Sequence, residues 1–374
     1  MEGTKPRTAS SLGMFDLLKG VGMLLIVFAH TSELYPVGDI STITPVTFFL
    51  FAYRESLMAA FYIASGYGFR KRSIGKCISQ QFKTLFKPYA YTGLATTIAH
   101  FVIHYKTFGN WNNAVYETYK VLGGFVLGLP HTATYFGQEF FSCGPMWYLL
   151  ALMIGWILLD IILNIFPESY IKWAVLGTML LGWGISLVWE APFCIAQGMV
   201  TVPYLYIGFL AKKKRLFEKK FRPLAILGLL AAALGVALGV LLTGKMDCVS
   251  LGEWTMGPVS ILLDGIVGLG FIVLFMKVQR LLDNPVTHLI EAVGRRSLYI
   301  FCIHTVELTA VPWYLMVQKY AAAPTKGLWL QYAVSLGSIF LLCEILLRRR
   351  DVMLKFFPAR RRHFAGHQRY VAKH

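Results

Sequence analysis

Charged side chains are scarce in this sequence, and acidic ones are scarcer than basic ones. Asp, Glu, Lys and Arg make up only 15% of the 374 residues, against roughly 25% in an ordinary soluble domain. Hydrophobic residues make up 56%, and the mean hydropathy is +0.57. A soluble protein of this composition could not cover its surface with polar groups, whereas a bilayer accepts an apolar surface. The composition therefore excludes a soluble enzyme and indicates a membrane protein.

The sequence also lacks CxxC cysteine pairs and evident internal repeats, and its first apolar run is not expected to be a cleaved leader. Its six cysteines include no CxxC spacing, which excludes a zinc ribbon and a redox pair of that type. No half of the chain repeats in the other, which disfavours the transporter folds built from repeated halves. The first apolar run has no small-residue cleavage site, so we expect it to be retained as a helix.

Long apolar runs are what the sequence does contain. A helix needs about 20 apolar residues to cross the hydrocarbon of a bilayer. We therefore expect an all-α, polytopic membrane protein with about ten transmembrane helices. The runs lie near residues 14–32, 46–69, 88–104, 146–166, 170–189, 194–211, 223–242, 257–277, 297–317 and 327–347.

The distribution of Lys and Arg predicts how these runs are oriented. With the N-terminus inside, only six of the 36 basic residues fall on the outer side, and the other 30 fall on the inner side. Because basic residues collect on the cytoplasmic side, we expect both termini in the cytoplasm of a multi-pass protein of the cell membrane. The net charge of +17 is then a topology signal and a surface for anionic lipids, not a sign of nucleic acid binding. The six outer residues are Arg54, Lys106, Lys120, Lys245, Lys319 and Lys326.

The apolar runs and the basic residues together divide the chain into two parts. Residues 1–347 are expected to form a single transmembrane domain, and residues 348–374 a basic cytoplasmic tail that lies on an anionic leaflet. The longest connection, 105–145, is expected outside. It contains the apolar stretch VLGGFVLGLP, which is too short to span and is expected to lie in the interface or to dip back into the membrane.

Ionisable side chains within the apolar runs are the candidates for function, because a charge at bilayer depth costs several kcal/mol. In the first run, FDLLKGVGMLLIVFAH places His30 eleven residues after Lys19. Eleven residues are about three helical turns and about 16 Å of rise, so both side chains lie on one face of the helix. Lys19 is then near the inner surface, and His30 is beyond the midplane. The alternative is a structural histidine bonded to a neighbouring carbonyl.

Two further segments combine basic residues with small or polar groups. In FYIASGYGFRKRS, Ser65 and Gly66 allow close approach of another helix or a ligand. In GRRSLYIFCIH, two arginines open a helix at the inner surface and His304 lies two turns deeper. The basic residues of these segments are Arg70, Lys71, Arg72, Arg295 and Arg296.

Together these segments resemble the acyltransferase-3 family of integral-membrane O-acyltransferases. The family's first helix carries a pattern like Asp-Gly-Leu-Arg with a histidine eleven residues after the arginine, which is similar to Asp16, Lys19 and His30, with lysine in place of arginine. Its second helix ends in a stretch like Phe-Phe-x-x-Ser-Gly, similar to the residues from Phe61 to Gly66. Three later family segments resemble QFKTLFKPY with Lys83 and Lys87, GPMWYLLAL, and GRRSLYIFCIH.

The resemblance implies an O-acyltransferase that moves an acyl group, with acetyl expected, from cytoplasmic acyl-CoA to a hydroxyl of a glycan or lipid-linked sugar. Acetyl-CoA is then a co-substrate, and no metal is expected. His30 would act as general base or carry the acyl group transiently. Glu33 would orient its ring or stand as an exposed acid at the loop edge, and His304 would be a second polar group around the acceptor or a packing residue. The cations expected to hold the CoA phosphates are Lys19, Arg70, Lys71, Arg72, Lys83, Lys87, Arg295 and Arg296.

Two other classes of function stay open from the sequence. One is a secondary transporter or flippase in which His30, Asp264 and Glu307 form a proton relay. The other is a structural or regulatory membrane domain without chemistry. His100 and His104 have the i, i+4 spacing of a zinc pair, but no neighbouring acid completes such a site.

Overall fold

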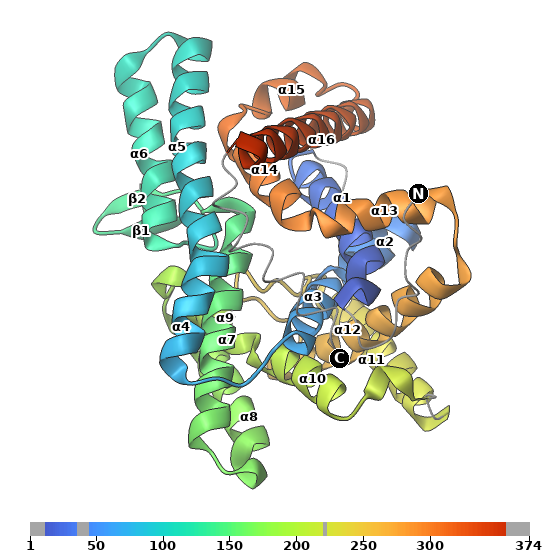
Figure 1. The fold of residues 1–374 in the computed structure, drawn as a ribbon. Coiled ribbons are helices and arrows are strands. Elements are labelled where there is room, and N and C mark those ends of the chain that lie inside the picture. Colours follow the sequence, from blue (N-terminus) through green and yellow to red (C-terminus); the bar gives the residue numbers. More distant parts are fainter. Residues whose placement is uncertain (1–11, 36–44, 220–222, 357–374) are drawn as a thin grey trace.

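Helices form nearly all of the secondary structure of the protein. The computed structural model describes residues 12–35, 45–219 and 223–356 (Figure 1). The only strands in these ranges are β1 (Ala133–Tyr135) and β2 (Gln138–Phe140), which pair antiparallel. The predicted all-α class is confirmed.

Six helical segments within the described residues are long and apolar enough to cross a membrane, so the chain is a multi-pass membrane protein. All six coincide with expected runs, and the last of them lies within α16 (Pro324–Phe356). The segments are Leu12–Ser32 (η1, Leu12–Phe15, and α1, Asp16–Ser32), Gly144–Ile165 (η4, Gly144–Met146, and α7, Trp147–Ile165), Glu168–Val188 (α8), Pro223–Thr243 (α11), Pro258–Leu281 (α12) and Pro324–Arg349.

A seventh span results if two bent helices are counted together. They are Pro192–Val200, which contains η5 (Pro192–Cys194) and α9 (Ile195–Val200), and α10 (Val202–Lys213). The bend between them is 50°. Pro203 stands in the first turn of α10, and because proline lacks an N–H and restricts the residue before it, the helix breaks there. The count of ten spans and the cytoplasmic position of both termini stay predictions.

The remaining three expected runs are helical but are shorter or less apolar than a full span. The run near 46–69 is divided at Tyr53, and the run near 297–317 is divided after Ala310. The helices are α2 (Pro45–Ala52) and α3 (Arg54–Tyr67), then α5 (Lys87–Phe108), then α14 (Ser297–Ala310) and α15 (Tyr314–Lys319).

The expected outer connection, 105–145, is not an irregular loop. After α5 ends, Gly109 turns the chain with φ +68°, and the side chain of Asn110 caps α6 (Trp111–Leu127) by accepting from the N–H of Asn113. Figure 1 shows α5 and α6 side by side, with β1 and β2 next to them. VLGGFVLGLP forms the last turns of α6 and the turn after it, and α6 packs against α5 and β2.

Two short amphipathic elements and the C-terminal helix complete the fold. The basic segment after α3 forms α4 (Ile74–Gln81) and the single π-helical turn η3 (Phe82–Phe86), which leads into α5. The expected boundary at residue 347 lies inside α16, so the first part of the expected tail continues that helix. Residues 357–374 of the tail lie outside the described residues.

Glycines set the distance between α1 and its neighbour α13 (Pro285–Arg295). A Cβ on Gly20 would lie 2.0 Å from the carbonyl oxygen of Ile290, and a Cβ on Gly294 would lie 1.9 Å from that of Asp16. The two backbones are therefore in direct contact. The same holds between α3 and α10, where a Cβ on Gly66 would lie 2.1 Å from the carbonyl oxygen of Leu205, which confirms the predicted close approach at Gly66.

We predict that Gly294→Ala destabilises the protein by roughly 1–3 kcal/mol, because the two helix backbones must separate. Gly177→Ala is the matched control, since that helical glycine has no atom within 4 Å of an added Cβ, and alanine there should be neutral or stabilising by up to about 1 kcal/mol. Thermal unfolding in detergent measures both. Equal midpoints for the two variants would contradict this packing.

Candidate active site

Two cavities lie along α1. The cavity around His30, which we call the His30 cavity, has a volume of about 650 Å³, and the cavity around Lys19, the Lys19 cavity, has a volume of about 440 Å³. Both volumes are in the range of sites for small molecules. Helix α1 is unbroken between the two residues, so they lie about 16 Å apart along one helix face, as their spacing predicted.

The two cavities are adjacent. They share four lining residues, and one of them, Ile26, stands on α1 between Lys19 and His30. The others come from three different helices, α3, α7 and α14. The shared residues are Ile26, Met58, Tyr148 and Phe301.

His30 is held by a carboxylate. Its Nδ1 lies 3.3 Å from Oε2 of Glu33, which follows the last residue of α1. The side chains of Thr31 and Ser32 hydrogen-bond to carbonyl oxygens of the preceding turn and hold the helix end. When the carboxylate accepts a hydrogen bond from the Nδ1–H group, the free lone pair of the neutral imidazole is at Nε2. The contact between His30 and Glu33 is present, and the Glu33 side chain is also 47% exposed, as the alternative of an acid at the loop edge expected.

Arg54, the first residue of α3, holds the carboxylate of Glu33 in place. Its Nη1 lies 2.7 Å from Oε1 of Glu33, and its Nε lies 3.3 Å from Oε1 of Glu55. Burial acts to raise the pKa of the Glu33 carboxyl, but the hydrogen bond and charge of His30 and the charge of Arg54 together lower it below its ordinary value. Glu33 is therefore a carboxylate at neutral pH. Arg54 and Glu33 are 21 residues apart in the sequence. No local sequence pattern predicts a contact over that separation, so the pairing of Arg54 with Glu33 could not be predicted.

His304 forms a second histidine–glutamate pair beside the first. Its Nδ1 lies 3.2 Å from Oε2 of Glu307, and the hydroxyl of Ser335 donates to Oε1 of that carboxylate at 2.7 Å. The rings of His304 and His30 have centroids 5.7 Å apart. His304 is 1% exposed and lines neither cavity, and its Nε2 has no partner among the described residues.

The two pairs share a sequence signature that sequence reasoning missed. The chain reads His-Thr-Ser-Glu at 30–33 and His-Thr-Val-Glu at 304–307. In a helix, residues three apart lie on the same face, so each glutamate reaches its own histidine. The repeat of this spacing was the available signal for Glu307.

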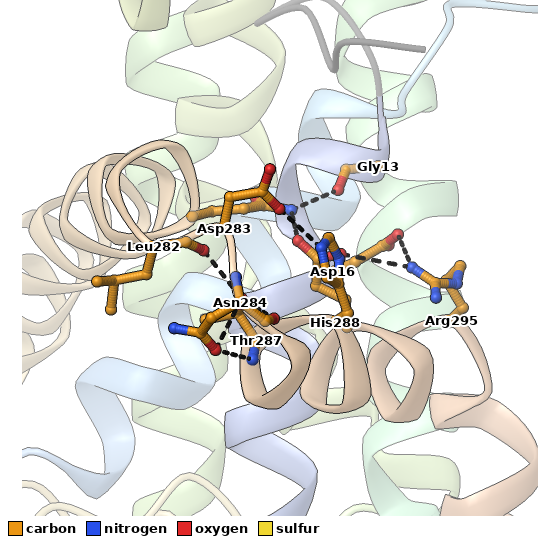
Figure 2. Close-up of polar contacts among 10 residues, drawn as sticks. Gly13, Asp16, Leu282, Asp283, Asn284, Thr287, His288 and Arg295 are labelled. Atoms are coloured by element: carbon orange, nitrogen blue, oxygen red, sulfur yellow. Dashed lines mark hydrogen bonds and ion pairs between the residues drawn. The ribbon is translucent and has the colours of Figure 1, made fainter. Parts of the chain in front are cut away.

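The Lys19 end of α1 is held by a polar cluster. Nζ of Lys19 lies 3.1 Å from Oδ1 of Asp16, and Arg295 of α13 lies 3.8 Å from Oδ2 of the same carboxylate. Figure 2 shows Arg295 reaching Asp16, and the carbonyl oxygen of Gly13, in η1, accepts a hydrogen bond from the side-chain amide of Gln279 in α12. Asn284 and Thr287 form a capping box that starts α13 at this place.

Of the eight cations predicted to hold phosphate, only Lys19 lines either cavity. Arg295 pairs with Asp16 and Glu291, and Arg296 lies 3.2 Å from Glu344. The side chain of Arg72 donates to Gln80, and its backbone N–H donates to Asp160. The remaining four of the eight are exposed, namely Arg70, Lys71, Lys83 and Lys87.

The buried acids do not form one chain with His30. Asp264 accepts a hydrogen bond from the hydroxyl of Ser56 at 2.5 Å, whereas Glu307 pairs with His304. The relay of His30, Asp264 and Glu307 considered for a transporter is therefore not assembled. Asp160 is 0% exposed, and one of its carboxylate oxygens accepts a hydrogen bond from the Arg72 backbone N–H inside the bundle.

The other predicted histidine pair lies away from both cavities. Nδ1 of His100 contacts the hydroxyl of Thr118 at 2.9 Å, and its ring stacks on that of His104. Within the part of the chain that the structure describes, no group of three or more His, Cys, Asp and Glu side chains could hold a metal ion.

Comparison with known proteins gives one match. A family model of the acyltransferase-3 type, described as an acyltransferase domain, matches residues 13–348. This range includes both histidine–glutamate pairs and both cavities. Neither the curated proteins nor the solved structures gave a match.

We predict that Arg54→Met destabilises the protein by roughly 3 kcal/mol, because the buried carboxylate of Glu55 and the carboxylate of Glu33 lose their shared cation. Arg348→Met is the matched control. Its pair with Glu344 is exposed, so the loss there should be under about 1 kcal/mol. Thermal unfolding of the two variants tests this, and an equally small effect in both would show that Arg54 does not hold the site.

Proposed function

The chain belongs to the acyltransferase-3 family, and from this membership we propose that it is an O-acetyltransferase of the cell membrane. It takes acetyl groups from cytoplasmic acetyl-CoA and places them on a hydroxyl of a glycan or lipid-linked sugar. One observation supports this more than any other: Lys19 and His30 stand on one face of α1 and open into two cavities that share four lining residues.

The Lys19 cavity receives the donor in this proposal. CoA carries several phosphate charges on one end and the thioester on the other. Lys19 binds phosphate at the cytoplasmic end, and the exposed cations around it raise the local concentration of the anionic ligand. The pantetheine arm then runs past Ile26 and Tyr148 and presents the thioester carbonyl next to His30. The mostly apolar lining of the Lys19 cavity suits this uncharged arm.

His30 acts as the general base. The acceptor oxygen attacks the thioester carbonyl carbon while its proton passes to Nε2 of His30. The carbon–sulfur bond then breaks, and the same proton passes to the leaving CoA sulfur, so no net proton is gained or lost. The Glu33 carboxylate favours this role because it holds the ring by Nδ1 and stabilises the imidazolium.

His304 is the second polar group in this proposal. Its ring packs close to that of His30, and its pairing with Glu307 keeps it oriented.

The first test separates binding from chemistry at His30. We predict that His30→Ala leaves the Kd for acetyl-CoA unchanged and lowers kcat by about 10²–10⁴-fold, the usual contribution of a general base. Calorimetry measures the Kd, and transfer of radiolabelled acetyl groups measures kcat. His100→Ala is the control, since that histidine lines neither cavity. Equal activity of the two variants would refute the catalytic role of His30.

The reciprocal test concerns Lys19. Removing one charged contact to phosphate costs about 1.5–3 kcal/mol, so Lys19→Met should raise the Kd for acetyl-CoA by about tenfold or more. Lys326→Met serves as control because that exposed lysine stands on the opposite side in the predicted topology. An unchanged Kd in Lys19→Met, or uptake of a solute without acetyl transfer, would contradict the donor site.

A further inference from the structure

We propose that the acceptor is a lipid, in which a hydroxyl-bearing headgroup is carried on a hydrocarbon chain. The headgroup lies at His30, and the chain leaves the His30 cavity between α2 and α12. The inference rests on the proposed function and narrows its acceptor from glycans in general to those attached to a membrane lipid.

The lining of the His30 cavity is divided into a polar end and an apolar wall. At the polar end, His30, Glu33 and Arg54 meet side chains from the connections after α6 and α11. One of these, His131, lies 2.7 Å from Glu190 and contacts the carbonyl oxygen of Ser250, so it ties three connections together over the cavity. Charged and hydroxyl groups of this kind recognise a sugar or phosphate headgroup.

Helices α2 and α12 supply the apolar wall. Their lining side chains carry no polar atom, and they form a continuous surface in which the rings of Phe49 and Phe271 have centroids 6.5 Å apart. A water-soluble glycan would place hydroxyls against this wall without hydrogen-bond partners, which costs free energy for each group. A hydrocarbon chain fits it. The wall residues are Phe49, Leu50, Phe51, Phe271, Leu274 and Phe275.

The apolar wall reaches the outer surface of the helix bundle. Phe49 and Leu274 both line the cavity, yet they are 50% and 52% exposed. In a chain that spans the membrane, exposed apolar side chains on spanning helices face lipid. Leu274 stands on the spanning helix α12, and we infer that the wall opens to hydrocarbon at Leu274 and the neighbouring Phe49, where a lipid chain enters.

A long acyl chain on the donor is the other hydrocarbon that could fill this wall. The donor, however, enters from the Lys19 cavity and needs no contact between the His30 cavity and the lipid-facing surface. The polar end beyond His30 would also be left without a ligand. The observed arrangement of headgroup site, wall and lipid-facing residues favours the lipid acceptor.

The test uses membranes from cells that make the full-length protein, supplied with radiolabelled acetyl-CoA. The label is separated into a chloroform–methanol extract and a water-soluble polymer fraction. We expect His30-dependent label in the extract, and we expect Leu274→Trp to lower it by about tenfold by blocking the wall. Leu262→Trp is the matched control, because Leu262 is an exposed leucine of α12 that lines neither cavity.

Each other outcome has a distinct meaning. His30-dependent label that appears only in the polymer and is unaffected by Leu274→Trp would overturn the lipid acceptor and leave the acetyltransferase standing. A preference for palmitoyl-CoA over acetyl-CoA that Leu274→Trp abolishes, with a soluble acceptor, would assign the wall to the donor chain and also overturn the inference. Absence of His30-dependent label from both fractions would overturn the proposed function itself.

Discussion

The direct backbone contact between α1 and α13 determines where both ends of the site lie. Gly20 and Gly294 bring the two helices together without side chains between them. This contact places Arg295 next to Asp16 and leaves Lys19 on the free face of α1, toward its cavity. Because α1 is rigid over its length, fixing one end also fixes His30 about 16 Å away. A shift of α1 would therefore misplace the cation and the imidazole together.

Pairing is the second constraint, since a charge in an apolar bundle is tolerated only with a partner. The two histidines are each held by a glutamate one turn later, and Glu33 is held in turn by Arg54. The pairs differ in exposure: His30 opens into a cavity, whereas His304 is buried behind it. The same spacing, with the glutamate three residues after the histidine, thus serves a reactive group on one helix and a supporting group on the other.

The sequence was most informative where the physics is local. The spacing of Lys19 and His30, the reach of Glu33 and the close approach at Gly66 follow from helix geometry alone, and the structure confirms them. Contacts between distant segments could not be predicted, such as Arg54 with Glu33 or Arg296 with Glu344. The division of the run 46–69 and the α5–α6 hairpin also escaped prediction, because hydropathy reports on burial and not on where a helix bends or ends.

The central claim is that one ligand joins the two cavities, with its phosphates at Lys19 and its thioester carbonyl at His30. A structure of the full-length protein with a non-hydrolysable acetyl-CoA analogue measures this directly. The account predicts phosphate oxygens within hydrogen-bond distance of the Lys19 ammonium, the pantetheine arm between Ile26 and Tyr148, and the carbonyl carbon beside Nε2 of His30. An analogue bound elsewhere, with both cavities filled by lipid, would contradict it.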